Sequence, residues 1–349
     1  MAALHRCRQY QRRVACVGEG LDGRTGQVAG DRVSARAFLG MSHTPLMGLN
    51  PISPAVEREL QGAIAAAREQ ALAFKPELIV LVAPDHYNGF FNELMPPFCV
   101  GTQAHSVGDY LTPPGDLNVD ATAAEALVHS LMEADFDVAL SRRMQVDHGF
   151  AQPLQLLWGG LETPPVIPVF LNAVAPPGIP RLRRCRALGE AIGRFMQGEK
   201  RRTLFIGSGG LSHEPPVPML SDPDPAVRDR ITLRQNPTAA EREAKTQRVM
   251  AAGMALASGQ SAMKALNPAW DQRWMDALAG DSTALDALCA MTEDSIAQEG
   301  GRSAHESKSW LVARSALPGL GTPRCIQRHY QAIPEYIAGF GVMWLEPTL

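Results

Sequence analysis

The sequence predicts an α/β protein with a mixed or parallel central sheet flanked by helices and with a mainly helical C-terminal portion. Two continuous apolar runs, residues 78–83 and 203–207, have the length and composition of strands buried on both faces. Segments with apolar residues at helical spacing alternate with such runs, and after residue 225 the helical pattern dominates. Alternation of this kind is typical of a sheet that helices cover on both faces.

Two further strands complete the predicted sheet. Residues 37–41 form a short apolar run that ends at Ser42-His43-Thr44-Pro45. Residues 166–171 form another run, but it contains Pro168, which cannot donate a backbone hydrogen bond. We therefore expect this strand to lie at an edge of the sheet or to be bulged at the proline.

The predicted helices lie between and after these strands, and the first of them ends before Pro76. They cover residues 56–74, 121–133, 186–196, 239–257, 268–279, 283–298 and 303–317. No linker composition interrupts the chain after residue 37, so we expect one domain over residues 37–349. Residues 1–36 are rich in Arg and Gly, and we expect a disordered extension or a stretch that precedes the natural start.

Composition excludes several classes of protein. The 349 residues carry a formal net charge of −3, so no basic excess favours nucleic acid as a partner. No apolar run is long enough to cross a membrane. The six cysteines lie far apart without a C-x-x-C pair, which argues against a zinc ribbon or a disulfide scaffold and indicates the cytoplasm.

Four of the nine histidines follow apolar runs. His43, His86 and His213 come shortly after the predicted strands that end at residues 41, 83 and 207, and His148 follows a shorter apolar stretch. Ligands of open α/β sheets bind outside the carboxyl ends of the strands. We therefore expect these four imidazoles to converge on one pocket.

Residues 207–212 read Gly-Ser-Gly-Gly-Leu-Ser, which superficially resembles a nucleotide-binding loop. The dinucleotide motif needs a glycine where Ser212 stands, and a hydrolase nucleophile elbow needs one where Ile206 stands. Nucleotide chemistry is therefore not expected. The glycines instead allow a tight turn that presents His213.

Convergent imidazoles indicate a metal site at the strand ends. Two histidines and one carboxylate with open positions form the site of non-haem Fe(II) oxygenases. The other two histidines could then act as acid and base near neutral pH. Glu306, Asp85 and Asp147 are all candidates for the carboxylate, and Asp85 and Asp147 could equally accept hydrogen bonds from metal-binding histidines.

Several segments resemble the class III extradiol ring-cleavage dioxygenases, a family of iron enzymes that open catechol rings. The similar segments are residues 42–45 (SHTP), 83–91 (APDHYNGFF), 95–99 (MPPFC), 144–153 (MQVDHGFAQP), 207–213 (GSGGLSH) and 333–341 (IPEYIAGFG). They occur in order from about residue 36 nearly to the C-terminus. The extension at residues 1–36 has no counterpart in this family.

The resemblance implies a single Fe²⁺ held by His43, His86 and Glu306, with His213 as the base and His148 as the acid. It also implies a catechol and O₂ as the reactants and a homo-oligomeric protein. Two alternatives differ from this expectation. The same chemistry could act on another catechol, such as protocatechuate or an alkylcatechol, or the chain could be a non-catalytic metal-binding relative.

Within the family, the segments are most similar to members that act on catechols with a propionate side chain. The carboxylate of such a substrate needs a cation or amide donors. The candidate cations in the sequence are Arg142, Arg143, Arg184 and Lys308.

Overall fold

The computed structural model describes residues 35–234, 237–319 and 321–348, so nearly all of the expected extension at 1–36 lies outside the described residues. Its centre is an eight-stranded mixed sheet in the order β10-β11-β1-β9-β2-β8-β3-β6. The strands are β1 (Arg36–Met41), β2 (Leu78–Ala83), β3 (Phe98–Gly101), β6 (Ala139–Ser141), β8 (Val166–Leu171), β9 (Thr203–Ser208), β10 (Arg324–Ile333) and β11 (Ala338–Glu346). β1, β9, β2 and β8 are parallel, which confirms the predicted fold class.

A second, three-stranded sheet joins β4 (Ala104–Ser106), β5 (Gly115–Asp116) and β7 (Met144–Val146). The helices are α2 (Pro54–Phe74), α3 (Ala121–Glu133), α4 (His148–Trp158), α5 (Leu182–Met196), α6 (Pro225–Thr232), α7 (Ala239–Ala257), α8 (Pro268–Ala279), α9 (Ser282–Cys289), α10 (Glu293–Gly300) and α11 (Lys308–Ser315). The described residues also form two 3₁₀ helices, η2 (Arg302–Ser307) and η3 (Pro334–Tyr336). Within the described parts of the chain, no helix combines the length and apolarity that a membrane span requires.

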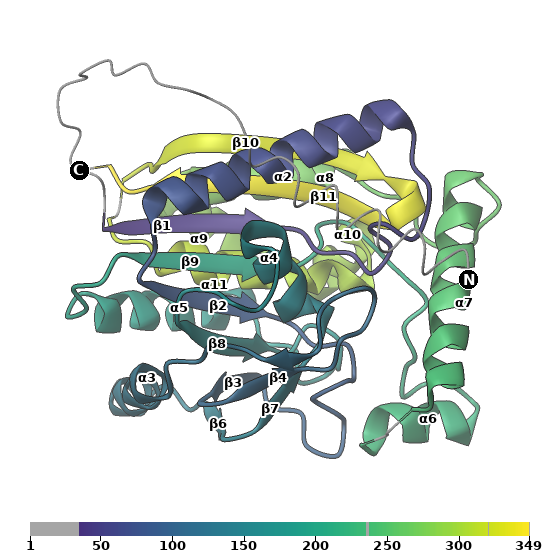
Figure 1. Cartoon of the computed structure of the whole chain (residues 1–349), viewed down its shortest axis with the longest axis horizontal. Helices are drawn as coiled ribbons and strands as arrows, with labels where there is room; N and C mark the ends of the chain where they lie inside the picture. The colour runs from purple at the N-terminus through teal and green to yellow at the C-terminus, as the bar shows by residue number, and fades with distance from the viewer. Residues whose placement is uncertain (1–34, 235–236, 320, 349) are drawn as a thin grey trace.

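Helices cover both faces of the large sheet. Successive residues of a strand face opposite sides, so Val80 packs in one core cluster and Leu81 packs in the other. One cluster includes residues of α5, α8 and α11, and the other includes residues of α2 and α4. Figure 1 shows α2 crossing the sheet, while α7 stands beyond the edge at which the arrows of β1 and β9 end.

The predicted edge position of residues 166–171 is wrong, and so is the alternative of a bulge at Pro168, since the register with β2 runs through the proline without a shift. β8 lies inside the sheet between β2 and β3, and all six of its residues are buried. Pro168 pairs with Leu81 of β2, whereas the ladder to β3 ends at Val169. The missing N–H of the proline therefore removes no hydrogen bond from the β3 ladder.

Other elements also differ from the prediction. The expected helix at 283–298 is two helices, α9 and α10, because Thr292 caps a new helix start. The expected helix at 303–317 begins as the 3₁₀ helix η2 and becomes α-helical at Lys308. The C-terminal β10–β11 hairpin, which follows the helical region, was not predicted.

Gly207 allows α11 to pack directly against β9. A Cβ at this position would lie 2.5 Å from Cα of Trp310 and 2.8 Å from the carbonyl oxygen of Ser309. Both are backbone atoms, so the helix would have to move. We expect Gly207→Ala to lower the free energy of unfolding by about 1–3 kcal/mol, measured by urea denaturation.

Gly62→Ala in α2 is the matched control, because nothing lies within 4 Å of a Cβ there. Alanine is the better helix former, so this variant should gain roughly 0.5–1 kcal/mol. Equal stability of the two variants would contradict the close approach of β9 and α11.

Candidate active site

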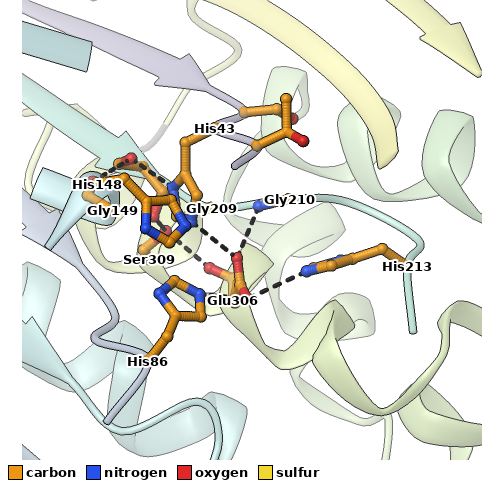
Figure 2. Close-up of polar contacts among 12 residues, drawn as sticks. His43, His86, His148, Gly149, Gly209, Gly210, His213, Glu306 and Ser309 are labelled. Carbon is orange, nitrogen blue, oxygen red and sulfur yellow. Dashed lines mark hydrogen bonds and ion pairs between the residues drawn. The ribbon is translucent and has the colours of Figure 1, made fainter. Parts of the chain in front are cut away.

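Three neighbouring parallel strands bring three of the predicted histidines to one edge of the sheet. His43 follows β1, His86 follows β2 and His213 follows β9, and β9 lies between the other two strands. His148 arrives separately, as the first residue of α4. Figure 2 shows all four imidazoles around the carboxylate of Glu306.

Glu306 lies at the centre of this cluster. It belongs to η2, and its side chain is only 2% exposed. Its Oε2 lies 3.2 Å from Nε2 of His43, and its Oε1 lies 3.1 Å from Nε2 of His86 and 3.0 Å from Nε2 of His213. The backbone N–H of Gly210 also donates to Oε2, over 3.1 Å.

The Nδ1 atoms of His43 and His86 have partners that fix which nitrogen faces Glu306. Ser208 Oγ donates to the carbonyl of Gly149, so it can accept from Nδ1 of His43, which lies 2.9 Å away. Nδ1 of His86 lies 3.0 Å from the carboxylate of Asp147. Each ring therefore turns Nε2 toward Glu306. Burial disfavours charge on His86, but Asp147 and Glu306 raise its pKa well above the ordinary value.

This arrangement fits a divalent metal ion. The Nε2 atoms of two imidazoles and a carboxylate face one another, and Nε2 of His43 has no hydrogen-bond partner among the described residues. Burial lowers the pKa of His43 to about 4, although Glu306 opposes this shift. The low pKa favours the neutral form of the imidazole, which is the form that binds metals. The set of donors, two nitrogens and one carboxylate, is one that ferrous iron accepts.

His148 lies beside the imidazoles of His43 and His86. Its ring stacks on that of His86, with centroids 4.6 Å apart and planes 17° apart, and lies 5.3 Å from the ring of His43. One nitrogen from each of these three histidines lies within 4.8 Å of the others. The structure thus brings together the four histidines that the sequence pattern singled out and the glutamate that the family resemblance implied.

Charges inside the cluster oppose the effect of burial on the pKa values of Glu306 and His213. Burial disfavours the ionised carboxylate of Glu306, but His213 and His86 outweigh it and hold its pKa well below the usual range. Burial likewise disfavours charge on His213, yet the charge and hydrogen bond of Glu306 raise its pKa above the ordinary value. Glu306 and His213 therefore form an ion pair.

Asp85 and Asp147, the other two candidate carboxylates, make different contacts. Asp85 accepts the backbone N–H groups of Asn88, Gly89 and Phe90, and its pKa rises to about 7 because of burial and the nearby Asp147. Asp147 binds Nδ1 of His86 and caps α4. Of the three candidates, only Glu306 reaches the Nε2 atoms of His43 and His86.

Asp271 anchors the loop that carries His213. Sequence reasoning missed this residue because α8, to which it belongs, lies far from the loop along the chain. This fully buried carboxylate accepts the N–H and the hydroxyl of Ser212 and the hydroxyl of Tyr330, each over 2.6 Å. Burial raises its pKa, although these hydrogen bonds oppose the shift.

We expect Asp271→Ala to cost roughly 2–4 kcal/mol in the free energy of unfolding, because it leaves buried donors without an acceptor. Tyr330→Phe, which removes one donor, should cost about 1 kcal/mol. Denaturant titration measures both. A loss from Asp271→Ala no larger than that from Tyr330→Phe would contradict the anchoring role.

Three of the cations considered for a substrate carboxylate are engaged elsewhere. Arg142 pairs with Glu125 at the surface, and the guanidinium of Arg184 lies over the ring of Phe136. Lys308 is fully buried and donates to the carbonyl of Pro180. Arg143 lines a groove of about 940 Å³ beside the small sheet.

Comparison with known proteins connects this geometry to a family. Residues 37–341 match the family described as the catalytic LigB subunit of aromatic ring-opening dioxygenase. A protein from Comamonas testosteroni named 2,3-dihydroxyphenylpropionate/2,3-dihydroxicinnamic acid 1,2-dioxygenase is 63% identical over 311 residues, covering 89% of this chain and 96% of the relative.

Proteins with the same name from other bacteria are also similar. The one from Cupriavidus pinatubonensis is 48% identical and aligns over 88% of this chain and 97% of its own length. One from Escherichia coli is 47% identical, over 86% and 95% respectively. The match to the family over most of the chain agrees with the resemblance seen in the motifs. The chain therefore belongs to the LigB family of aromatic ring-opening dioxygenases.

Proposed function

We propose that the chain is an Fe²⁺-dependent extradiol dioxygenase that opens the ring of 3-(2,3-dihydroxyphenyl)propionate and of 2,3-dihydroxycinnamate. One observation carries the proposal: His43, His86 and Glu306 direct three electron-pair donors at one point that His148 and His213 also border. The names of the relatives support the choice of substrate. The expected product is a hydroxy-keto-dienedioate that contains both atoms of O₂.

In this proposal His43, His86 and Glu306 hold the iron. When bound, Fe²⁺ would supply Lewis acidity toward the two catechol oxygens and electrons toward O₂. The chain contributes two neutral imidazoles and one negative charge. Ser208 and Asp147 keep the imidazoles in the tautomer that binds metal, through their contacts with Nδ1.

His213 and His148 carry the protons. Nδ1 of His213 donates to the carbonyl of Leu211, 2.8 Å away, so proton exchange with the catechol falls to Nε2, the atom that contacts Glu306. We assign to His148 the opposite transfer, a proton given to the departing oxygen as a ring carbon migrates. Both transfers suit imidazole, whose charge changes near neutral pH without a large shift in pKa.

The test is ring fission under controlled metal loading. The protein is purified without oxygen, reconstituted with Fe²⁺, mixed with 3-(2,3-dihydroxyphenyl)propionate and exposed to O₂, while oxygen uptake and the yellow ring-opened product are followed. We expect one O₂ consumed for each product formed. Product from protocatechuate or an alkylcatechol but not from this substrate would refute the substrate, and no reaction with any catechol would refute the enzyme.

We also propose that residues 37–349 form one catalytic domain, and that the protein is a homo-oligomer that acts in the cytoplasm. Both core clusters share the strands of one sheet, which supports a single domain. Light scattering of the purified protein should give a mass that is a multiple of 37.7 kDa. A mass of 37.7 kDa itself would contradict the oligomer.

A further inference from the structure

The carboxylate of Asp109 holds His148 at two points. Its Oδ2 lies 2.7 Å from Nδ1 of the ring, and its Oδ1 accepts the backbone N–H of His148 over 2.8 Å. Neither side chain is open to bulk water, since His148 is 3% and Asp109 12% exposed. An ionised carboxylate only accepts hydrogen bonds, so the proton of this contact lies on Nδ1.

We propose that Asp109 is the positioning residue for His148: it fixes the rotation and the tautomer of the imidazole, so that Nε2 is the nitrogen that exchanges a proton with the reacting catechol. This inference rests on the proposed ring cleavage. Asp109 does not touch the substrate in this account and acts only through His148.

The neighbouring Asp147 cannot take this role. Although it directly precedes His148, its Oδ1 lies 4.0 Å from Nδ1, beyond hydrogen-bond distance. Its carboxylate is instead bound to the backbone N–H and to Nδ1 of His86. The two aspartates therefore serve different imidazoles, Asp147 that of His86 and Asp109 that of His148.

The backbone around Asp109 is held in a strained conformation. Gly108, Tyr110 and Leu111 have φ values of 72°, 43° and 66°, a region that residues with side chains rarely adopt. Such outliers persist where the surroundings enforce them, and they cluster at functional sites. Here they place the Asp109 carboxylate against the first residue of α4.

Neighbouring contacts enforce this loop. Both the backbone N–H and the hydroxyl of Thr112 donate to the carbonyl of Asp109, over 2.9 and 2.6 Å. Gln155, one turn from the end of α4, donates to the carbonyl of Leu111 over 3.2 Å. α4 therefore carries both His148 and a side chain that holds the loop of Asp109.

The ring of His148 is also confined on its sides. Tyr110 meets it edge to face, with centroids 5.1 Å apart, and His86 stacks on it. Figure 2 shows the rings of His148 and His86 side by side. Packing against these two rings limits tilting of the His148 imidazole. The contact with Asp109 then selects one of the two orientations that are related by a flip of the ring.

The test is a double-mutant cycle with His148. We expect Asp109→Asn to lower kcat about 10²-fold, as misplacement of a catalytic group does, with KM changed less than about twofold and metal content unchanged. In a His148→Gln background the same substitution should change kcat less than about twofold, because no acid remains to be positioned. Losses that multiply in the double variant would overturn the proposal.

Asp116→Asn is the matched control. Asp116 contacts Nδ1 of His105 at the same distance, 2.7 Å, but this pair is exposed on the small sheet. We expect wild-type kcat from this variant. An equal loss of kcat from Asp116→Asn and Asp109→Asn would show that any broken aspartate–histidine pair impairs the enzyme, and it would overturn the specific role of Asp109.

A second measurement uses the unmodified chain, in case Asp109→Asn does not fold. Nitrogen NMR of protein with ¹⁵N-labelled histidine, loaded with diamagnetic Zn²⁺ and assigned with His148→Gln, reports which nitrogen carries the proton. The proposal requires a protonated Nδ1, and a proton on Nε2 alone would refute it. Wild-type turnover is measured in parallel, so failure of ring cleavage is seen separately from failure of the positioning role.

Discussion

Replacing Glu306 with glutamine is expected to abolish retention of the metal. The amide keeps the size of the side chain but removes the negative charge that faces Nε2 of His43 and of His86. Removing a residue that only hydrogen-bonds to a metal ligand already lowers metal affinity about 10–100-fold. Removing the ligand itself should therefore lower metal affinity at least about 10²-fold. Metal content after gel filtration and calorimetric titration with Fe²⁺ under nitrogen measure the effect.

Glu299→Gln is the control for this experiment. Glu299 pairs with Arg273 at the surface, so its charge can be removed without touching the cluster. We expect wild-type metal content from it. Full metal content in Glu306→Gln would show that another carboxylate holds the ion, and Asp147, which already contacts His86, would be examined next.

Replacing His213 with glutamine is expected to remove turnover while leaving the metal in place. Glutamine can still donate to Glu306 from its amide, but it cannot accept a proton from the catechol. General-base catalysis contributes about 10²–10⁴-fold, so kcat should fall by this factor. Oxygen uptake by the Fe²⁺-loaded variant gives the rate, and the iron content of the same sample confirms loading.

The pH profile adds a second readout. The base must be unprotonated and the acid protonated, so wild-type kcat should rise and then fall as pH increases. His213→Gln should lose the rising limb, because the group whose deprotonation produces it is gone. His129→Gln, an exposed substitution in α3, should keep both limbs. A His213→Gln enzyme with near-normal kcat and an unchanged profile would contradict the role of His213 as the base.

Local pattern and topology together made much of the site predictable. Parallel strands end at one edge, so the residues that follow β1, β2 and β9 had to meet there, and His43, His86 and His213 do so. Apolar runs were sufficient to locate these strands because each is buried on both faces. The residues around Glu306, Asp85 and Asp147 in the sequence do not distinguish which of the three is the candidate metal ligand. The family resemblance pointed to Glu306.

The features that were missed depend on contacts between distant segments. Asp109 meets His148 across 39 residues, and Asp271 meets Ser212 across 59. β10 is an edge strand with many polar residues, so it has no apolar run, and only its pairing with β11 makes it a strand. Pro168 was misplaced because the ladder between β8 and β3 ends at Val169, which spares the proline a lost hydrogen bond, and this end depends on the pairing of another segment.

The most direct measurement is the structure of the product formed from 3-(2,3-dihydroxyphenyl)propionate by the Fe²⁺-loaded protein, determined by NMR and mass spectrometry. Our account requires cleavage beside one of the two hydroxylated carbons, which gives a hydroxy-keto-dienedioate with both oxygen atoms added. Cleavage between the two hydroxylated carbons, or recovery of unchanged catechol from protein whose iron content is stoichiometric, would contradict it.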